Sequence, residues 1–233
     1  MKNGHLHPST TFLRELIKIF EELWFEVYEG PEVDDEWHNF DALNVPDDHP
    51  ARDEQDTFWL KDGRLLRTHT SNCQVRAVKD KGAPLHIVIP GRCFRNEATD
   101  QSHETTFYQL EGLYIDKNVT VANLFWVLEY TIKKLYGKNV EYRFRPHHYP
   151  FVEPGYDIDI KMGSPTERNS KEWMELVGSG MVHPKVLRNM GLDPEVWSGF
   201  AFGFGPDRMM MKKYKIQDIR QLFGNDLRFL RQF

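Results

Sequence analysis

The amino-acid sequence predicts an α+β fold in which an antiparallel sheet is flanked by helices. Strand-like runs follow one another without an intervening helix at residues 140–144, 156–162 and 171–177. Helical periodicity is strongest elsewhere, at residues 9–25 and 120–136, so the two kinds of element are segregated along the chain. A doubly wound parallel sheet would require strands and helices to alternate regularly. The pattern therefore favours an antiparallel sheet.

The composition is that of a globular protein and argues against several functional classes. The 233 residues are 28% charged and 40% hydrophobic, with a net charge of −5. This balance fits one folded domain rather than a disordered chain or a protein that mainly coats nucleic acid. The apolar runs are too short to span a bilayer and the N-terminus is not a signal peptide, which predicts no membrane partner. Only Cys73 and Cys93 are present, so we expect a reducing, cytoplasmic location.

The expected elements follow from local patterns, beginning with the helix at residues 9–25. Its apolar residues recur at helical spacing, and Ser9 or Thr10 offers an N-cap. A short strand follows and ends at Gly30-Pro31. Later elements are expected at residues 58–67 (a hairpin), 70–79 (a helix), 85–90 (a strand) and 120–136 (a helix that ends at Gly137). The last helix should begin near Gly205-Pro206, because proline suits a first helical turn.

The segment at residues 94–112 carries more polar chemistry than a core strand needs for packing. Arg95 and Glu97 are two residues apart, as are Gln109 and Glu111, so on strands each pair would point to one face. A single exposed pair of this kind would be an ion pair of little energetic value. The combination of a cation, two carboxylates and an amide instead suggests a site for a charged ligand.

ATP-dependent activation of a carboxylic acid would use these residues. A fixed guanidinium, Arg95, would neutralise the charge that grows on the α-phosphate. Glu97 could accept a hydrogen bond from the adenine amino group, and Phe107 could stack under the adenine ring. His103 lies in the loop that would cover the phosphates. Arg208, in the first turn of the last helix, could face the ATP from the other side.

Two further segments could bind the acid itself. Residues 66–71, LRTHTS, end a strand with polar side chains that either cap the next helix or hold the ends of an amino acid together with Gln109 and Glu111. Prolines within residues 146–154 are expected to fix a loop in which Tyr149 and Phe151 alternate. These rings could line a pocket for an aromatic side chain, or pack in the core beside the loop. Glu153 is an oxygen donor of the kind that magnesium prefers.

Taken together, these stretches resemble the catalytic core of bacterial-type phenylalanyl-tRNA synthetase α subunits, a family of class II aminoacyl-tRNA synthetases. The matching stretches cover nearly the whole chain in family order. They are EGPEV, NFDALNVPDDHPARDEQDTFWL, LLRTHTS, GRCFRNEATDQSHETTFYQLEGL, PFVEPG, WMELVGSGMVHPKV, GFAFGFGPDRMMM and LRFLRQF. The resemblance implies the class II catalytic fold, an antiparallel sheet flanked by helices. It also implies activation of L-phenylalanine through a phenylalanyl-adenylate, with ATP and Mg²⁺, and transfer to tRNA(Phe). The family's β subunit would be a partner in an α₂β₂ assembly, or a homodimer would form. The homodimer contact would be motif 1 of the family, which is the helix at residues 9–25 and the short strand that ends at Gly30-Pro31.

The resemblance also assigns roles to individual residues. The implied ATP-binding residues are Arg95, Glu97, His103, Phe107 and Arg208, with Arg95 and Arg208 as the catalytic pair. The implied residues around the backbone end of phenylalanine are Trp59, His69, Ser71, Gln109 and Glu111. The implied aromatic wall is Tyr149, Phe151 and Val152, and the small-residue floor is Ala201 and Gly203. Glu153 matches the magnesium position.

The sequence departs from the family pattern at a few points. Tyr149 stands where the family often has phenylalanine, and Asp207 replaces a common glutamate. The family usually begins with a helical arm that contacts tRNA, whereas Met1 lies close to the start of the core. Residues 1–233 are therefore expected to form the catalytic core without that arm. A paralogue with another acceptor, or a non-catalytic regulator, are the alternatives. Retention of Arg95 and Arg208 counts against the regulator.

Overall fold

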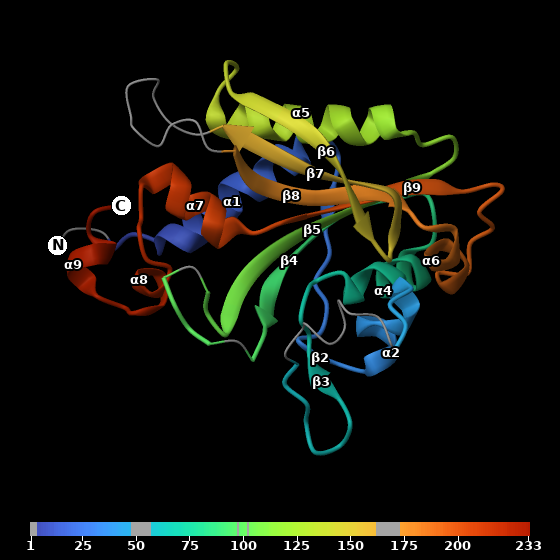
Figure 1. The fold of residues 1–233 in the computed structure, drawn as a ribbon, viewed down its shortest axis with the longest axis horizontal. Helices are drawn as coiled ribbons and strands as arrows, with labels where there is room; N and C mark the ends of the chain where they lie inside the picture. Colours follow the sequence, from blue (N-terminus) through green and yellow to red (C-terminus); the bar gives the residue numbers. More distant parts are fainter. Residues whose placement is uncertain (1–3, 48–56, 97, 102, 162–172) are drawn as a thin grey trace.

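The structure is a computed structural model, and it describes residues 4–47, 57–96, 98–101, 103–161 and 173–233. Within these residues seven strands form one sheet in the order β1-β4-β5-β9-β8-β7-β6, which crosses the middle of the molecule (Figure 1). The strands are β1 (Glu26–Val27), β4 (Leu85–Phe94), β5 (Thr106–Asp116), β6 (Glu141–Tyr149), β7 (Val152–Lys161), β8 (Trp173–Val182) and β9 (Ser198–Phe204). Every neighbouring pair is antiparallel except β1 with β4. The predicted α+β class and antiparallel sheet are confirmed.

Helices cover both faces of the sheet. On one face lie α1 (Pro8–Glu21), α5 (Val121–Tyr136) and α7 (Pro206–Tyr214), and on the other lie α2 (Glu36–Asn39), α4 (Asn72–Lys81) and α6 (Pro184–Asn189) (Figure 1). The remaining elements are β2 (Val33–Asp34), η1 (Asp41–Leu43), β3 (Leu65–Leu66), α8 (Arg220–Phe223) and α9 (Leu227–Leu230). Within the described part of the chain, no helix is long and apolar enough to cross a membrane.

The sheet separates two hydrophobic cores. The first packs α1, α5 and α7 against the sheet and includes Phe12, Leu128 and Phe202. The second packs α2, α4 and α6 against the opposite face and includes Val75 and Ala201. Because side chains alternate along a strand, neighbouring residues of β9 enter different cores. The sheet is therefore buried on both faces over much of its area.

Most of the expected elements are present, with two corrections, the first of which is that the N-cap of α1 is His7 and not Ser9 or Thr10. The first amphipathic helix is α1, the helix expected at residues 70–79 is α4, and the last helix begins at Pro206 as predicted. The loop expected at residues 146–154 is only a turn at residues 150–151, because Pro146 lies in β6 and Pro154 in β7. Proline is tolerated there because β6 is the edge strand and the β7 register is shifted near Pro154.

Candidate active site

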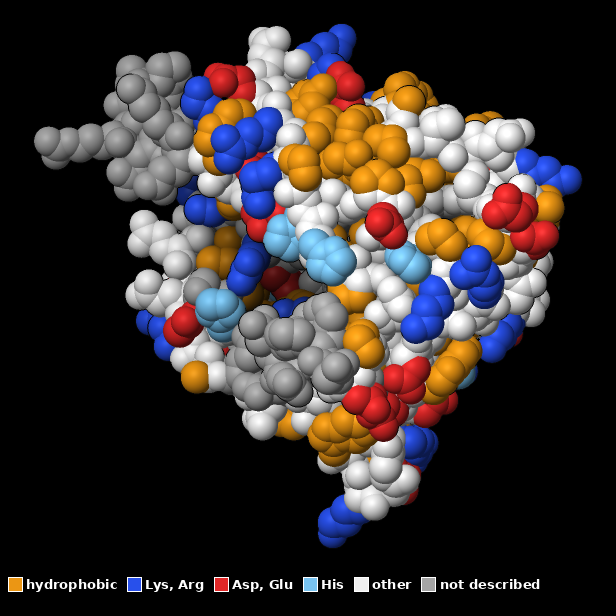
Figure 2. Space-filling model, turned by 45° about the vertical axis from the view of Figure 1, so that its right-hand side comes forward, with side chains coloured by type: hydrophobic (Ala, Val, Ile, Leu, Met, Phe, Trp, Pro, Cys, Tyr) orange, Lys and Arg blue, Asp and Glu red, His pale blue; other side chains and the backbone are white. Residues whose placement is uncertain are grey.

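One face of the sheet is built from polar side chains on β5 and small residues on β8 and β9. Glu111 lies opposite Gly203 in the β5–β9 pair, and Gly203 lies opposite Gly178 in the β8–β9 pair. The glycines leave space above the sheet, while Phe107 and Gln109 stand on the same side of β5 as Glu111. Figure 2 shows a hollow in the molecular surface with histidine side chains around it and charged groups inside.

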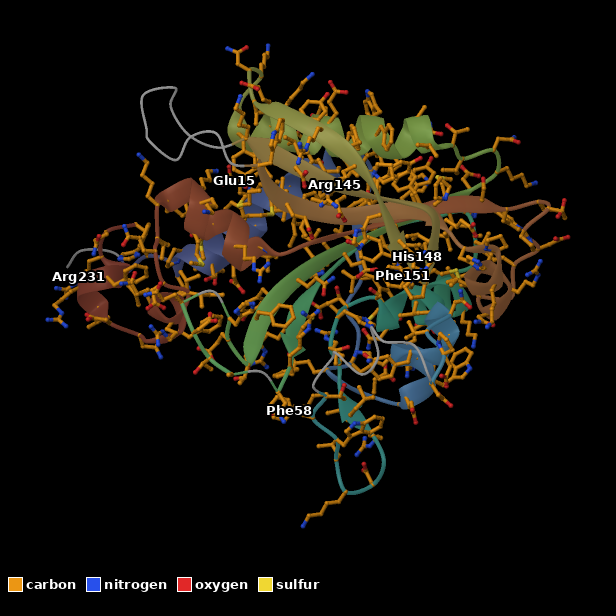
Figure 3. The ribbon with its side chains drawn as sticks, in the orientation of Figure 1. Glu15, Phe58, Arg145, His148, Phe151 and Arg231 are labelled. Atoms are coloured by element: carbon orange, nitrogen blue, oxygen red, sulfur yellow. The ribbon has the colours of Figure 1, made fainter. Side chains whose placement is uncertain are left out.

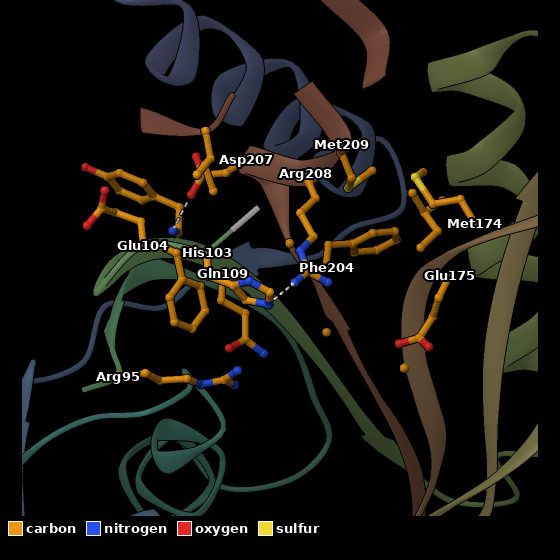
Figure 4. Close-up of a pocket in the computed structure, with 17 residues that line it drawn as sticks. Arg95, His103, Glu104, Gln109, Met174, Glu175, Phe204, Asp207, Arg208 and Met209 are labelled. Atoms are coloured by element: carbon orange, nitrogen blue, oxygen red, sulfur yellow. Dashed lines mark hydrogen bonds between the residues drawn. The ribbon is translucent and has the colours of Figure 1, made fainter. Parts of the chain in front are cut away.

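A cavity of about 220 Å³ lies over this part of the sheet (Figure 4). The predicted residues that line it are Arg95, His103, Phe107, Gln109, Gly203 and Arg208. They come from the end of β4, the loop after it, β5, β9 and the first turn of α7. The structure thus brings together the residues predicted for ATP, except Glu97, which lies outside the described residues.

Arg95 is oriented by two neighbours. Its guanidinium carbon lies 4.8 Å from the centroid of the Phe107 ring, and its Nε donates a hydrogen bond to the Thr68 carbonyl at 3.4 Å. The backbone amide of Arg95 donates to the Thr105 carbonyl at 2.9 Å, which continues the β4–β5 pairing past the end of β4. A guanidinium held in this way is a preorganised cation, as stabilisation of a phosphate requires.

Arg208 enters the cavity from the opposite side and meets His103. The Arg208 Nη2 and His103 Nε2 atoms are 3.4 Å apart, and the other ring nitrogen of His103 lies 3.0 Å from the Asp100 carboxylate (Figure 4). With Nδ1–H donating to Asp100, Nε2 is left as an acceptor for the guanidinium. The contact connects the loop after β4 with the start of α7.

Asp207 anchors that first turn of α7 and was not predicted as a site residue. It is 3% exposed, and its Oδ2 accepts a hydrogen bond from the Tyr108 backbone amide at 2.7 Å. Burial raises the pKa of the Asp207 carboxyl to about 6. The bond joins α7 to β5 and so places the neighbouring Arg208 over the cavity.

A buried carboxylate, Glu111, forms the centre of a second cluster beside the cavity. Ser71 Oγ donates to Glu111 Oε2 at 2.5 Å, Gln74 Nε2 donates to Oε1, and Gln109 Nε2 lies 3.4 Å from Oε2. Burial raises the pKa of Glu111 to about 7, against the opposing effect of these hydrogen bonds. Ser71 makes no capping hydrogen bond to α4, so the structure favours its role in this cluster over the capping role. Gln74 was missed, although it lies three residues after Ser71 on one helix face.

Of the two other residues predicted for the backbone end of phenylalanine, His69 is buried and Trp59 is exposed. His69 is buried, and both its burial and the nearby Arg95 charge lower its pKa to about 3, so the ring is neutral. Its Nδ1 atom has no hydrogen-bond partner among the described residues, which suits an atom that meets a ligand. Trp59 is 51% exposed on the hairpin that carries Phe58, below the sheet, and does not line the cavity (Figure 3). Its predicted role remains a prediction.

The predicted wall and floor of the amino-acid pocket lie together. The rings of Tyr149 and Phe151 are stacked, with centroids 5.6 Å apart. Both pack against the core that contains Val152 and Ala201. Gly180, opposite Ala201 in the sheet, is held close to Val152, so that a Cβ added there would lie 2.6 Å from it. Gly180 thus leaves the space that the Val152 side chain fills beside Ala201.

Glu153 lies apart from the ATP cavity. Its side chain is 74% exposed, its Oε2 is 3.4 Å from His183 Nε2, and it lines a separate cavity of about 260 Å³. The two cavities share no lining residue. Among the described residues only Asp34, Asp35 and His38 cluster closely enough to suggest a metal site, and Arg76 is already paired with both carboxylates there. The magnesium role of Glu153 remains a prediction.

Glu175 is a carboxylate that the sequence argument missed. It lines the ATP cavity from β8, across from Arg208 (Figure 4). Burial, followed by the charge of Asp157, raises its pKa. The other two carboxylates that line this cavity already accept backbone hydrogen bonds, Asp207 from Tyr108 and Glu104 from Thr105. Glu175 Oε2 lies 3.7 Å from Arg145 Nη2, and the place of Glu175 in the cavity makes it a second candidate for magnesium, which prefers oxygen donors next to phosphates.

Comparison with known proteins points in one direction. A family model described as tRNA synthetases class II core domain (F) matches residues 1–233. The chain is 49% identical over 235 residues to the phenylalanine--tRNA ligase alpha subunit of Clostridium perfringens (strain SM101 / Type A), covering 99% of this chain and 69% of that one. It is also 49% identical over 233 residues to the alpha subunit of Proteus mirabilis (strain HI4320), covering 100% and 69%.

A solved structure supports the fold alone. The pyrrolysyl-tRNA synthetase of Desulfitobacterium hafniense superposes with a TM-score of 0.71 at 17% identity, over 95% of this chain and 75% of that one. At this level of identity the likeness concerns the arrangement of strands and helices and carries no statement about substrate.

Proposed function

We propose that this chain, which belongs to the family of phenylalanine--tRNA ligase α subunits, activates L-phenylalanine with ATP and transfers it to tRNA(Phe). The observation that carries the proposal is the shared face of the sheet. Two arginines frame a cavity there, directly beside a buried carboxylate with hydrogen-bonding neighbours. Activation needs both sites side by side, because the acid must reach the α-phosphorus in line with the leaving pyrophosphate.

The ATP side follows from the two arginines. As the phenylalanine carboxylate attacks the α-phosphorus, negative charge grows on the phosphate oxygens, and Arg95, a cavity-lining cation held against Phe107, would stabilise it. Arg208 and His103 would hold the phosphates from the other side. A carboxylate oxygen of phenylalanine bonds to the α-phosphorus while the bond from that phosphorus to pyrophosphate breaks, which gives phenylalanyl-adenylate. Phe107 and Glu97 keep their predicted roles toward adenine.

The phenylalanine side follows from the buried cluster. Ionised Glu111, with Gln109 and Ser71, would accept hydrogen bonds from the ammonium group, whose charge offsets the cost of burying the carboxylate. His69, whose Nδ1 has no hydrogen-bond partner in the described part of the chain, and Trp59 would complete the backbone end. The phenyl ring would enter between the aromatic wall and the small-residue floor, namely Tyr149, Phe151, Val152, Ala201 and Gly203.

Magnesium would be held on the phosphate side of the cavity. Glu153, in its separate cavity, is the candidate implied by the sequence, and Glu175, in the ATP cavity, is the second candidate. When bound, the ion supplies positive charge next to the pyrophosphate that leaves.

The relatives are named alpha subunits, which supports a β-subunit partner in an α₂β₂ assembly. The alternative is a homodimer, and in either case the motif 1 region, α1 and β1, would supply the contact. The second residue of β1, Val27, is 38% exposed on an edge strand. That strand and α1 border a cavity of about 630 Å³, which leaves this region open to a partner. A translation enzyme of this kind is expected to act in the cytoplasm.

Phenylalanine-dependent ATP–pyrophosphate exchange tests the proposal. The chain should catalyse exchange with phenylalanine, alone or with the β subunit, and with the β subunit it should charge tRNA(Phe). Absence of exchange even with the β subunit would refute the activation step and favour a non-catalytic regulator. Exchange without tRNA charging, with labelled phenylalanine on another acceptor, would favour the paralogue.

A further inference from the structure

Asp157, on β7, is a fully buried carboxylate that the activation chemistry does not use. It is 0% exposed, and three side chains from the edge strand β6 surround it. The Tyr149 hydroxyl donates to Asp157 Oδ1 at 2.6 Å, Arg145 Nη2 lies 2.8 Å from Oδ2, and His147 Nδ1 lies 3.2 Å from Oδ2. Burial of a carboxylate is costly unless it is paired in this way.

The register of the sheet explains how these groups meet. Arg145 lies directly opposite Asp157 in the β6–β7 pair. His147 and Tyr149 follow at every second residue of β6, so all three side chains point to the same face as Asp157. Figure 3 shows Arg145 along β6 and the labelled His148 and Phe151 at the end of that strand nearest α4. The carboxylate thus connects the middle of β6 to the turn that carries the aromatic wall.

The ring of Tyr149 is constrained by several neighbours. It stacks on Phe151 and lies 4.5 Å from the His147 ring, centroid to centroid. It also covers two glycines, since a Cβ added at Gly178 would lie 2.6 Å from the hydroxyl and one at Gly155 would lie 3.5 Å from the ring. Burial, together with the Asp157 hydrogen bond, raises the pKa of Tyr149, so the hydroxyl remains a donor.

We propose that Asp157 is a positioning residue for phenylalanine, which fixes the Tyr149 ring as one wall of the amino-acid pocket. The inference rests on the proposed function and deepens it. The hydroxyl of Tyr149 then has a structural purpose at a position where packing alone needs only a ring. Arg145 and His147 act by holding the carboxylate in place, and they do not touch the amino acid.

The choice of variants follows from these contacts. Arg145 also lies 3.7 Å from Glu175, which lines the ATP cavity, so a change of Arg145 would disturb both sites. Tyr149→Phe removes only the hydroxyl and keeps the ring. Asp157→Asn keeps the shape and removes the charge. Tyr142→Phe is the matched control, because Tyr142 lies on the same strand and its hydroxyl bonds to Glu129, on the helix side of the sheet.

The experiment measures the Kd for phenylalanine by isothermal titration calorimetry without ATP, on the full chain together with any subunit it assembles with. Tyr149→Phe should raise the Kd about three- to tenfold, the size expected for loss of one ordinary hydrogen bond. Asp157→Asn should raise it at least as much. The double variant should add little to either single change, because both remove one interaction. Tyr142→Phe should bind as wild type does, and the KM for ATP of Tyr149→Phe should stay within about twofold of the wild-type value.

The outcomes separate the two proposals. Unchanged affinity in Tyr149→Phe, or an equal loss in Tyr142→Phe, would overturn the positioning role. Additive losses in the double variant would also overturn it, since they would mean that the two residues act independently. Failure of the wild-type protein to bind phenylalanine would instead refute the proposed function.

Discussion

The two faces of the sheet meet opposite requirements, and β9 shows the contrast within one strand. Phe200, Phe202 and Phe204 are each at most 2% exposed and fill the core under α1, α5 and α7. Ala201 and Gly203 alternate with them and point to the other face, where the cavity lies. One face is stabilised by tightly packed side chains, whereas small side chains on the other face leave space for a cavity.

Glycines that face the two sides of the sheet are required for different reasons. Gly112, on β5, faces the helices, and a Cβ there would overlap the ring of Phe202. Gly203 faces the site, and a Cβ there would lie 2.9 Å from Gln109 Nε2, a group proposed to bind phenylalanine. The first glycine is required by packing and the second by the ligand-binding side chains. Residue type alone therefore does not distinguish a structural position from a functional one.

The largest expected effect concerns the face of the sheet that α1, α5 and α7 cover. Phe202→Ala should lower the free energy of unfolding by about 3–5 kcal/mol, because it removes a fully buried ring and leaves a cavity. Urea denaturation measures the change, and Ala201→Gly, one residue away on the site face, serves as the comparison with a much smaller loss. A loss under about 1 kcal/mol for Phe202→Ala would mean that this core rearranges to fill the gap.

Arg95→Ala, on the face of the sheet that carries the cavity, should slow activation and leave the free energy of unfolding almost unchanged. We expect the activation barrier to rise by about 2–4 kcal/mol, because a preorganised cation at the α-phosphate is lost. Pyrophosphate exchange measures the rate, and urea denaturation should show stability close to that of the wild type. An unchanged exchange rate would remove the assigned role of Arg95.

The smallest of the three effects concerns the buried Glu111. Its folded-state pKa of about 7 lies above the ordinary value of 4.5, so the folded state binds the proton more tightly than the unfolded state does. This stabilisation is complete below pH 4.5 and is lost as the pH rises through 7. Relative to Glu111→Gln, the wild-type protein without phenylalanine should lose on the order of 2 kcal/mol of unfolding free energy between pH 5 and pH 8.

Denaturation of both proteins across this pH range provides the measurement. Parallel curves for the wild type and Glu111→Gln would show that Glu111 does not titrate there. The comparison with Glu111→Gln is needed because burial also raises the pKa of Asp207, at the start of α7, to about 6, and its titration cancels between the two proteins.

Local patterns predicted much of the fold. Helical spacing identified α1 and α5, a possible cap at Thr70 indicated α4, and the clustering of strands indicated an antiparallel sheet. The loop predicted at residues 146–154 was too long, because proline at an edge strand gives the same local pattern as proline in a loop.

The candidate site likewise contains residues that could be predicted from the sequence and residues that could not. The resemblance named residues that the structure does place around one cavity, including Arg95 and Arg208. Asp157 and Glu175 were missed because their environment depends on which residues of distant strands lie opposite them. A shift of one residue at the irregular β7–β8 pairing would turn either side chain to the other face. Local patterns carry no information about that register.

The position of β9 in the sheet has a consequence for the order in which the molecule can be assembled. β9 pairs with β5 on one side and with β8 on the other, yet Ser198–Phe204 comes after every other strand in the chain. The strands of two partial sheets, β1-β4-β5 and β8-β7-β6, are therefore synthesised before the strand that joins them. The pairing of β5 with β9 is a long-range contact of the kind that forms slowly. Continuity of the sheet and the positions of Ala201 and Gly203 thus depend on one strand that is synthesised late.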